Sequence, residues 1–360
     1  MSSMSSMSRM IPMPTSAKRI TNCSILLAAI CTSTSFGQTQ LIEFIYDAPT
    51  LDRWNYPFNG APGFRLSAST FGAIEIDGFD DHDAQLVLGF ETFDEFPLGL
   101  DPSAYRVLWA TVTLTNTNAN VFRFDGTYDT HDTYLDLDDS LDLDLGRPVH
   151  LWALGYRNGF DQSTWGEFTV FGGTPTVEPT QESRNAFAAY FPVDQTPVDI
   201  SNNLKQEFDP TPMAIGQTDA VAPGEIVPAD TTYTFDVSMC DPFVRAYLAD
   251  GLSFGELRFA ATSLHSASGG PDGGNGDIVY PFWYTRENPI AQLLGFTPTL
   301  NLRVRIGSPG DYNADDSFNF FDVAAFLADF TSGNLDADLT GDCVLNFFDV
   351  SEFLLAFTQG

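Results

Sequence analysis

The amino-acid sequence predicts a mainly β protein, an antiparallel β-sandwich or jelly roll, with a small α-helical EF-hand-type module at the C-terminus. Three observations predict it. Short runs with alternating apolar residues fill the body of the chain, and Pro/Gly/Ser-rich breaks separate them. The last 53 residues instead contain a duplicated Asp-rich unit in which each loop precedes a run of helical periodicity.

Residues 1–37 are predicted to be a signal peptide. Lys18 and Arg19 precede the apolar run 25–30, and small residues at Ser35 and Gly37 suit cleavage after Gly37. The apolar run is shorter than the roughly 20 residues that a membrane-spanning helix needs. We therefore expect a secreted protein, extracellular or at the cell surface, with no membrane insertion after the signal is removed.

The strongly negative charge of the chain limits the kinds of molecule that it can bind. The chain has 16 Lys+Arg against 48 Asp+Glu, a formal net charge of -32. Nucleic acids are polyanions and need clustered cations, so they are excluded as partners. Metal cations and neutral molecules such as polysaccharides remain as candidate binding partners.

Cysteine usage predicts little covalent cross-linking. Cys23 and Cys31 would leave with the signal peptide, and the two that remain, Cys240 and Cys343, fall in different predicted domains. We expect no disulfide framework, so the size of the core must supply stability.

In the body, residues 38–307, one strand is predicted with a defined buried face. The run 105–115 alternates and places four apolar residues on one side: Leu108, Ala110, Val112 and Leu114. Further β-rich runs are 234–237, 257–261 and 300–306, and a helix is expected over 242–250. A Pro/Gly-rich break near 172–182 leaves open whether the body is one sandwich or two.

Residues 308–360 form a separate predicted domain. They contain ten acidic residues and no Lys or Arg. The repeats 311–331 and 338–358 are offset by 27 residues and are identical at eleven of 21 positions. After each loop, apolar residues keep helical spacing, which predicts two helices that need a partner to bury their apolar faces.

The spacing of oxygen-bearing residues in both loops predicts calcium binding. Ca²⁺ is a hard cation that takes six to eight oxygen ligands, and alternate positions of such a loop aim them at one centre. The expected ligands of the first site are Asp311, Asn313, Asp315, the Ser317 carbonyl, Asn319 and Asp322. Those of the second site are Asp338, Thr340, Asp342, the Val344 carbonyl, Asn346 and Asp349. Thr340 stands where Asn or Asp is usual, so the second site should be weaker.

With Asp at position 12 of both loops, residues 310–357 resemble the dockerin family, and most closely the dockerin-like C-terminal modules of planctomycete-type exported proteins. The resemblance implies binding to a cohesin-type or other surface receptor. Position 6, usually Gly, is Asp316 in the first loop and Cys343 in the second. The pairs 320–321 and 347–348 are all Phe, and we expect one Phe of each pair to lie in the core.

The body contains weaker signals for binding. Acidic runs occur at 77–83 and 136–144, where a solvated acidic edge is the favoured reading over a calcium site between loops. Four histidines lack short metal-ligand spacing and are expected to be ordinary structural residues: His82, His131, His150 and His265. Several aromatics are candidates for stacking on sugars, although core packing explains them equally well: Trp54, Tyr56, Trp109, Trp152, Trp165, Trp283 and Tyr284.

An enzyme is the alternative function. If 75–80 is a strand, Glu75 and Asp77 share one face, as the two carboxylates of a retaining glycosidase would. The pattern is faintly similar to the signature of jelly-roll endoglucanases, which would make the protein a secreted glycan-active enzyme. Residues 233–264 are loosely similar to DNRLRE-type modules, which are extracellular and structural or adhesive. The sequence favours a secreted, non-catalytic binding or structural protein, tethered through the calcium module to a cell-surface or extracellular assembly.

Overall fold

The computed structural model describes residues 39–74, 76–119, 121–134, 146–173, 184–192, 196–267 and 279–359. All of these residues belong to one compact unit. The predicted signal peptide, Glu75, the acidic run 136–144 and most of the break 172–182 lie outside the described residues.

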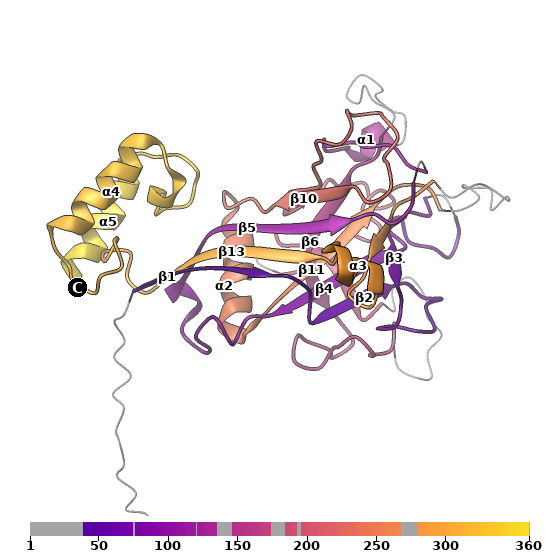
Figure 1. Ribbon diagram of the computed structural model, residues 1–360, viewed down its shortest axis with the longest axis horizontal. Helices are drawn as coiled ribbons and strands as arrows, with labels where there is room; N and C mark the ends of the chain where they lie inside the picture. Colours follow the sequence, from indigo (N-terminus) through magenta and orange to yellow (C-terminus); the bar gives the residue numbers. More distant parts are fainter. Residues whose placement is uncertain are drawn as a thin grey trace, which may run out of the picture. The chain divides into compact units, whose positions relative to one another are not determined.

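A four-stranded antiparallel sheet has the order β1–β13–β5–β10 (Figure 1). Its strands are β1 (Gln40–Tyr46), β5 (Tyr105–Thr115), β10 (Thr232–Asp236) and β13 (Thr299–Ile306). The strand predicted over 105–115 is confirmed as β5. The buried face of β5 differs from the predicted one at a single place. The pairing of β5 with β13 shifts register between Arg303 and Val304 of β13 and skips Leu108. Val107 is therefore buried in place of Leu108.

The second sheet has seven strands in the order β2–β4–β11–β6–β7–β8, with β9 paired to β6. Their bounds are β2 (Leu51–Asn55), β4 (Gln85–Glu91), β6 (Val149–Tyr156), β7 (Ala186–Tyr190), β8 (Val198–Asp199), β9 (Ala214–Ile215) and β11 (Glu256–Ser263). Strands from both sides of the break 172–182 join this one sheet. The first and last strands of the body, β1 and β13, also pair with each other.

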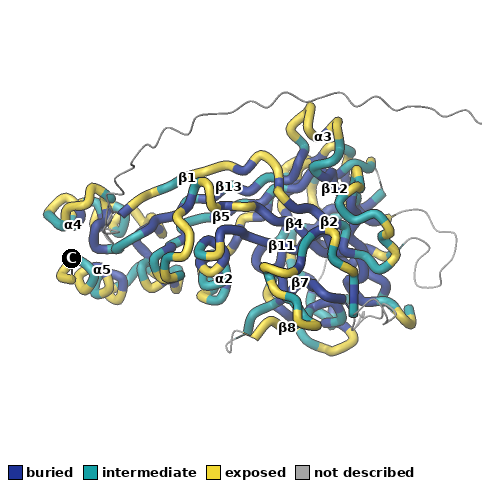
Figure 2. Tube along the Cα trace, turned by 90° about the horizontal axis from the view of Figure 1, so that it is seen from below, coloured by how far each residue is buried: buried dark blue, intermediate teal, exposed yellow. Residues whose placement is uncertain are grey.

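The two sheets enclose the main apolar core, as in a β-sandwich. Phe235 and Leu302 reach it from the first sheet, and Phe90 and Phe259 from the second. A second apolar cluster, which includes Val87 and Ala260, covers the other face of the seven-stranded sheet. Strands β4 and β11 are consequently buried on both faces, and Figure 2 shows both as buried.

Shorter elements complete the body. A two-stranded sheet joins β3 (Ser67–Ser69) to β12 (Phe282–Tyr284). The remaining elements are η1 (Pro102–Ala104), α1 (His131–Tyr134), α2 (Pro242–Phe254) and α3 (Pro289–Leu294). The helix predicted over 242–250 is confirmed as α2. Asp241 caps its first turn, and Gly255 ends it at φ 97°, a left-handed conformation that glycine adopts without strain.

The C-terminal repeats form α4 (Phe320–Ser332), η3 (Leu335–Ala337) and α5 (Phe347–Gln359). The two predicted helices are therefore present, and they share a small core of their own. The rings of Phe326 and Phe353 stack at 4.3 Å between centroids, and Tyr312 packs edge-on against both. None of the helices in the described residues is long and apolar enough to span a bilayer.

Candidate metal centre

The loops that precede α4 and α5, loop 1 (311–322) and loop 2 (338–349), follow the same backbone path. Positions 4 and 6 are left-handed in both loops. Ala314 and Asp316 have φ of 59° and 64°, and Gly341 and Cys343 have φ of 70° and 57°. Non-glycine residues at such angles cost about 1 kcal/mol or more and persist only where other contacts impose them. The sharp turn that usually takes Gly at position 6 is therefore made without it.

In loop 1, the carboxylates at positions 1 and 12 organise the turn. Asp311 accepts hydrogen bonds from the backbone N–H groups of Asp315 and Asp316, at 3.1 and 3.0 Å. Asp322 accepts from the N–H groups of Asn313 and Asn319, at 3.1 and 2.9 Å. The second of these bonds closes a capping box with the Asn319 side chain at the start of α4.

Loop 2 repeats this pattern with its own residues. Asp338 accepts from the N–H groups of Asp342 and Cys343, at 3.2 and 2.8 Å. Asp349 accepts from Thr340 and Asn346, at 3.0 and 2.8 Å. The structure therefore brings the predicted residues of each repeat together around one turn, in the same order in both.

The two loops differ in how their carboxylates converge. In loop 1, oxygen atoms of Asp311, Asp315 and Asp322 lie within 4.8 Å of one another, and Asp311 and Asp322 are fully buried. Oxygen donors of Asn313, Ser317 and Asn319 lie in the same loop. A donor set made only of oxygens fits a hard divalent cation such as Ca²⁺. Within the described part of the chain, loop 2 supplies no such group of three carboxylates.

Thr340 explains part of this difference. Its hydroxyl donates to Asp349 at 2.9 Å and to Asp338 at 3.3 Å. Burial disfavours the ionised form of Asp349, but the hydrogen bonds from Thr340 and Asn346 outweigh this and lower its pKa. The hydroxyl thus occupies carboxylate oxygens that a cation would otherwise share.

Loop 2 is also attached to the body. Cys343 forms a disulfide with Cys240, immediately before α2, across 103 residues. The expectation that these cysteines form no disulfide is wrong, because α2 and loop 2 are neighbours in space. Arg106 of β5 donates to the Asp338 carbonyl, and Arg245 of α2 donates to the Thr340 carbonyl, at 2.6 and 3.2 Å.

The Phe pairs are exposed. Phe320 and Phe347 are each 75% exposed, and Phe321 and Phe348 are 67% and 68% exposed. The expectation that one Phe of each pair lies in the core is wrong. The core of the repeats takes its phenylalanines from further along each helix, at Phe326 and Phe353.

In the body, the described residues 76–80 of the segment proposed for the glycosidase pair form no strand. Asp77 is exposed in a turn, and Glu75 lies outside the described residues. The following acids are buried and paired, so they are not the solvated edge that was expected. Asp80 pairs with Arg184 at 2.7 Å, and Asp81 pairs with Lys205 at 3.1 Å. Burial raises the pKa of Asp83 to about 6.

Three of the histidines lie in the interior. Burial lowers the pKa of His82 and His265 to about 4 and that of His150 to about 3, so all three are neutral near pH 7. His131 is only partly buried and contacts Asp209 at 2.9 Å, which raises its pKa. The histidines show no shared site within the described residues.

A cluster of three acidic side chains in the body was not predicted from the sequence. Asp52, Glu167 and Glu287 converge within 4.8 Å. They come from distant segments, so no local spacing could have indicated them. Arg286 pairs with Glu167 at 2.6 Å and with Glu287 at 2.8 Å, and it supplies a cation from the chain itself. Burial raises the pKa of Asp52 to about 8.

Most of the aromatic candidates are core residues. Trp152, Trp165, Trp283 and Tyr284 are buried. Tyr56 stacks on the Trp54 ring at 4.6 Å, and the Arg65 guanidinium lies 5.1 Å from the centre of that ring. Trp54, Tyr56 and Trp109 are half-buried, and the structure singles out none of the seven as a stacking platform for sugars.

Comparisons of the chain with models of protein families and with curated proteins find no match.

Proposed function

We propose that residues 308–360 are a dockerin-like attachment module that binds Ca²⁺ in loop 1 and, more weakly, in loop 2. The observation that carries this proposal is the convergence of Asp311, Asp315 and Asp322. Three carboxylates held this close repel one another, and the repeats contain no Lys or Arg to neutralise them. A bound cation removes that repulsion and holds the start of α4 in place.

The exposed Phe pairs supply the surface for a partner. Four large apolar side chains at the starts of α4 and α5 are the kind of residue that becomes buried at protein interfaces. The proposed partner is a cohesin-type or other surface receptor protein. Calcium would act indirectly, by ordering the loops that lead into both pairs.

The β-sandwich is then the part that the module attaches to a cell surface or an extracellular assembly. We propose a non-catalytic binding or structural role for it. The runner-up, a glycan-active enzyme, loses its structural basis because Asp77 lies in a turn and not on a strand face.

Calcium titration of the full chain tests the module. Calorimetry should show a stronger and a weaker site, and Asp311→Ala should abolish the stronger one. Asn334→Ala, a change in the connection between the repeats, is the matched control and should leave both sites intact. A chain that binds no calcium would refute the proposal.

Receptor binding is tested separately. Saturable binding to a purified cohesin-type domain should require calcium and should be lost in the double variant Phe320→Ser/Phe347→Ser. Phe168→Ser removes an equally exposed Phe from the body (63% exposed) and should have no effect. Binding that survives in both chelator and the double variant would place the receptor surface elsewhere.

A further inference from the structure

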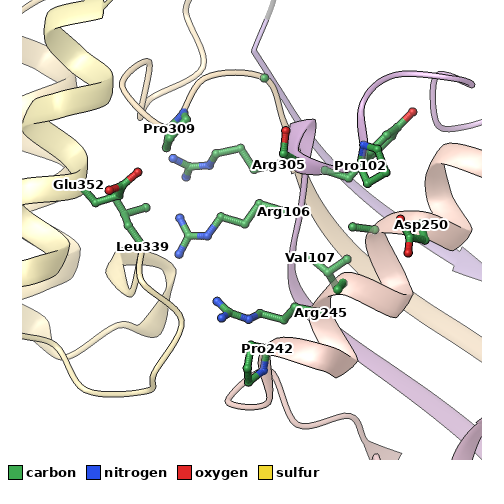
Figure 3. Close-up of a pocket in the computed structure, with 15 residues that line it drawn as sticks. Pro102, Arg106, Val107, Pro242, Arg245, Asp250, Arg305, Pro309, Leu339 and Glu352 are labelled. Atoms are coloured by element: carbon green, nitrogen blue, oxygen red, sulfur yellow. The ribbon is translucent and has the colours of Figure 1, made fainter. Parts of the chain in front are cut away.

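Three arginines surround a cavity of about 470 Å³ between the body and the C-terminal repeats. Arg106 comes from β5, Arg245 from α2 and Arg305 from β13. Figure 3 shows the three guanidinium groups extending from the body toward Leu339 and Glu352, and the side chain of Asp250 lying apart from them. We call this cavity the arginine pocket.

Each arginine makes one contact with the repeats and keeps other donors free. Arg106 and Arg245 each donate to a carbonyl of loop 2, and the Arg305 guanidinium lies 4.1 Å from the centre of the Tyr312 ring. Buried nitrogens without a hydrogen-bond partner remain on all three: Arg106 Nη1, Arg245 Nε, and Arg305 Nε and Nη1. Arg305 is only 5% exposed. Charged donors left unpaired in the interior are strongly unfavourable.

The arginines outnumber the carboxylates in the lining of the arginine pocket. None of the three arginines forms an ion pair with a carboxylate of the described residues. Burial and the nearby Arg305 lower the pKa of Arg106 to about 10. The lining holds three arginines and two carboxylates, Asp250 and Glu352, in a chain whose net charge is -32. Outside the lining, Asp329, Asp336 and Asp338 act on Arg106 or Arg305 through their charge, without an ion pair to either.

We propose that the arginine pocket binds a tetrahedral oxyanion, sulfate or phosphate, either free or as the ester of a small molecule. The planar fork of donors on each guanidinium matches the oxygens of such anions. A cavity of this volume falls in the range of small-molecule sites and has room for more than the oxyanion. The proposal does not depend on calcium binding by the loops.

Calorimetry of the full chain, at constant ionic strength and without calcium, tests this proposal. Sodium sulfate, sodium phosphate, glucose 6-sulfate and glucose 6-phosphate are titrated in turn. One saturable site is expected, and tighter binding of an ester than of its free anion would identify an ester ligand. Arg305→Gln should weaken binding at least about tenfold, because it removes charge-assisted hydrogen bonds.

Arg303→Gln is the matched control. Arg303 lies two residues away on β13 and pairs with Asp336 outside the pocket lining, at 3.2 Å. Its loss should leave the affinity within about twofold, whereas Glu352→Gln should strengthen binding by removing a facing negative charge.

A further variant separates loss of binding from loss of folding. Ala246→Phe keeps all three arginines and fills the cavity from α2, so binding should fall while the thermal transition is retained. Absence of saturable binding by all four probes would overturn the proposal. Equal weakening by Arg303→Gln and Arg305→Gln would also overturn it, since it would indicate only the general electrostatic field.

Discussion

Loop 1 and loop 2 have one backbone path and two different surroundings. In loop 1, three carboxylates converge, and the Thr39 N–H of the body donates a hydrogen bond to Asp316, at 3.1 Å. In loop 2, a threonine hydroxyl occupies carboxylate oxygens, a disulfide joins the turn to α2, and two arginines hold its carbonyls.

The difference shows that the same turn can be stabilised in two ways. Loop 1 concentrates negative charge, and under the calcium proposal a cation offsets the repulsion. Loop 2 is held by neighbouring protein groups, a disulfide and two arginines, and we expect it to depend less on calcium. Identical spacing of ligands in a repeat therefore does not imply equal dependence on the ion.

Removal of the disulfide should have the largest effect. Cross-linking a loop of about 100 residues is worth about 4–5 kcal/mol in the chain-entropy model, and Cys240 and Cys343 are 103 residues apart. The double variant Cys240→Ser/Cys343→Ser should lower the free energy of unfolding by about that amount, measured by urea denaturation in chelator.

Loss of the disulfide should affect the two loops differently. Treatment with reductant should reproduce the effect of the double variant. Calcium binding by loop 1 should survive in it, while binding by loop 2 weakens. Unchanged stability in the reduced protein would show that the arginine contacts alone hold loop 2.

Calcium removal should affect loop 1 more than loop 2. At a calcium concentration of 100 Kd, one site contributes about 2.7 kcal/mol to the free energy of unfolding. Asp311→Ala should remove most of the rise in Tm that calcium produces, and the equivalent Asp338→Ala should remove less. Differential scanning calorimetry in calcium and in chelator measures both. An equal loss of the calcium-dependent rise in Tm in the two variants would contradict the prediction that loop 1 binds calcium more tightly than loop 2.

Exchanging the residues at position 3 of the two loops should make their calcium affinities more alike. Thr340→Asp replaces the donating hydroxyl with a carboxylate and should strengthen calcium binding by loop 2 about tenfold, or about 1.4 kcal/mol. Asn313→Thr should weaken loop 1 correspondingly. Thr340→Val, which is close to threonine in shape, controls for loss of the hydroxyl alone. No gain of affinity in Thr340→Asp would show that the contacts with the body limit the site.

The smallest predicted effect is on acid stability. The pKa of Asp349 is lower in the folded protein than in the unfolded chain. An acid with a lowered pKa stabilises the fold above its unfolded pKa of about 3.9, and this stability is lost as the pH falls toward the folded value. In chelator, Asp349→Asn should therefore reduce stability near pH 6 and flatten its decline below about pH 4. A decline as steep as that of the parent chain would assign acid sensitivity to other groups.

Much of the β body was predictable where a strand has one buried face. The alternation in 105–115 identifies β5, and the β-rich runs 234–237 and 300–306 overlap β10 and β13. The run 257–261 lies in β11, which is buried on both faces, and was found from its β-rich composition alone. Strands β4 and β6 lie in a sheet with apolar clusters on both faces, so their residues are buried without alternation and give no period-2 signal. The bulge that exchanges Val107 for Leu108 places an extra residue, Leu108, in β5 opposite the step from Arg303 to Val304, and the apolar run 107–110 does not mark it.

By itself, the sequence determined the features that depend on local spacing. The loop residues, the helices α4 and α5, and the cap of α2 follow from residues within about twelve positions of one another, because turns and helices close their hydrogen bonds over that range. Only the tertiary structure decided that Cys343 meets Cys240, that three arginines from β5, α2 and β13 share one cavity, and that the Phe pairs face outward. Those outcomes depend on how surfaces far apart in the chain pack together, and burial, charge pairing and covalent linkage act through that packing.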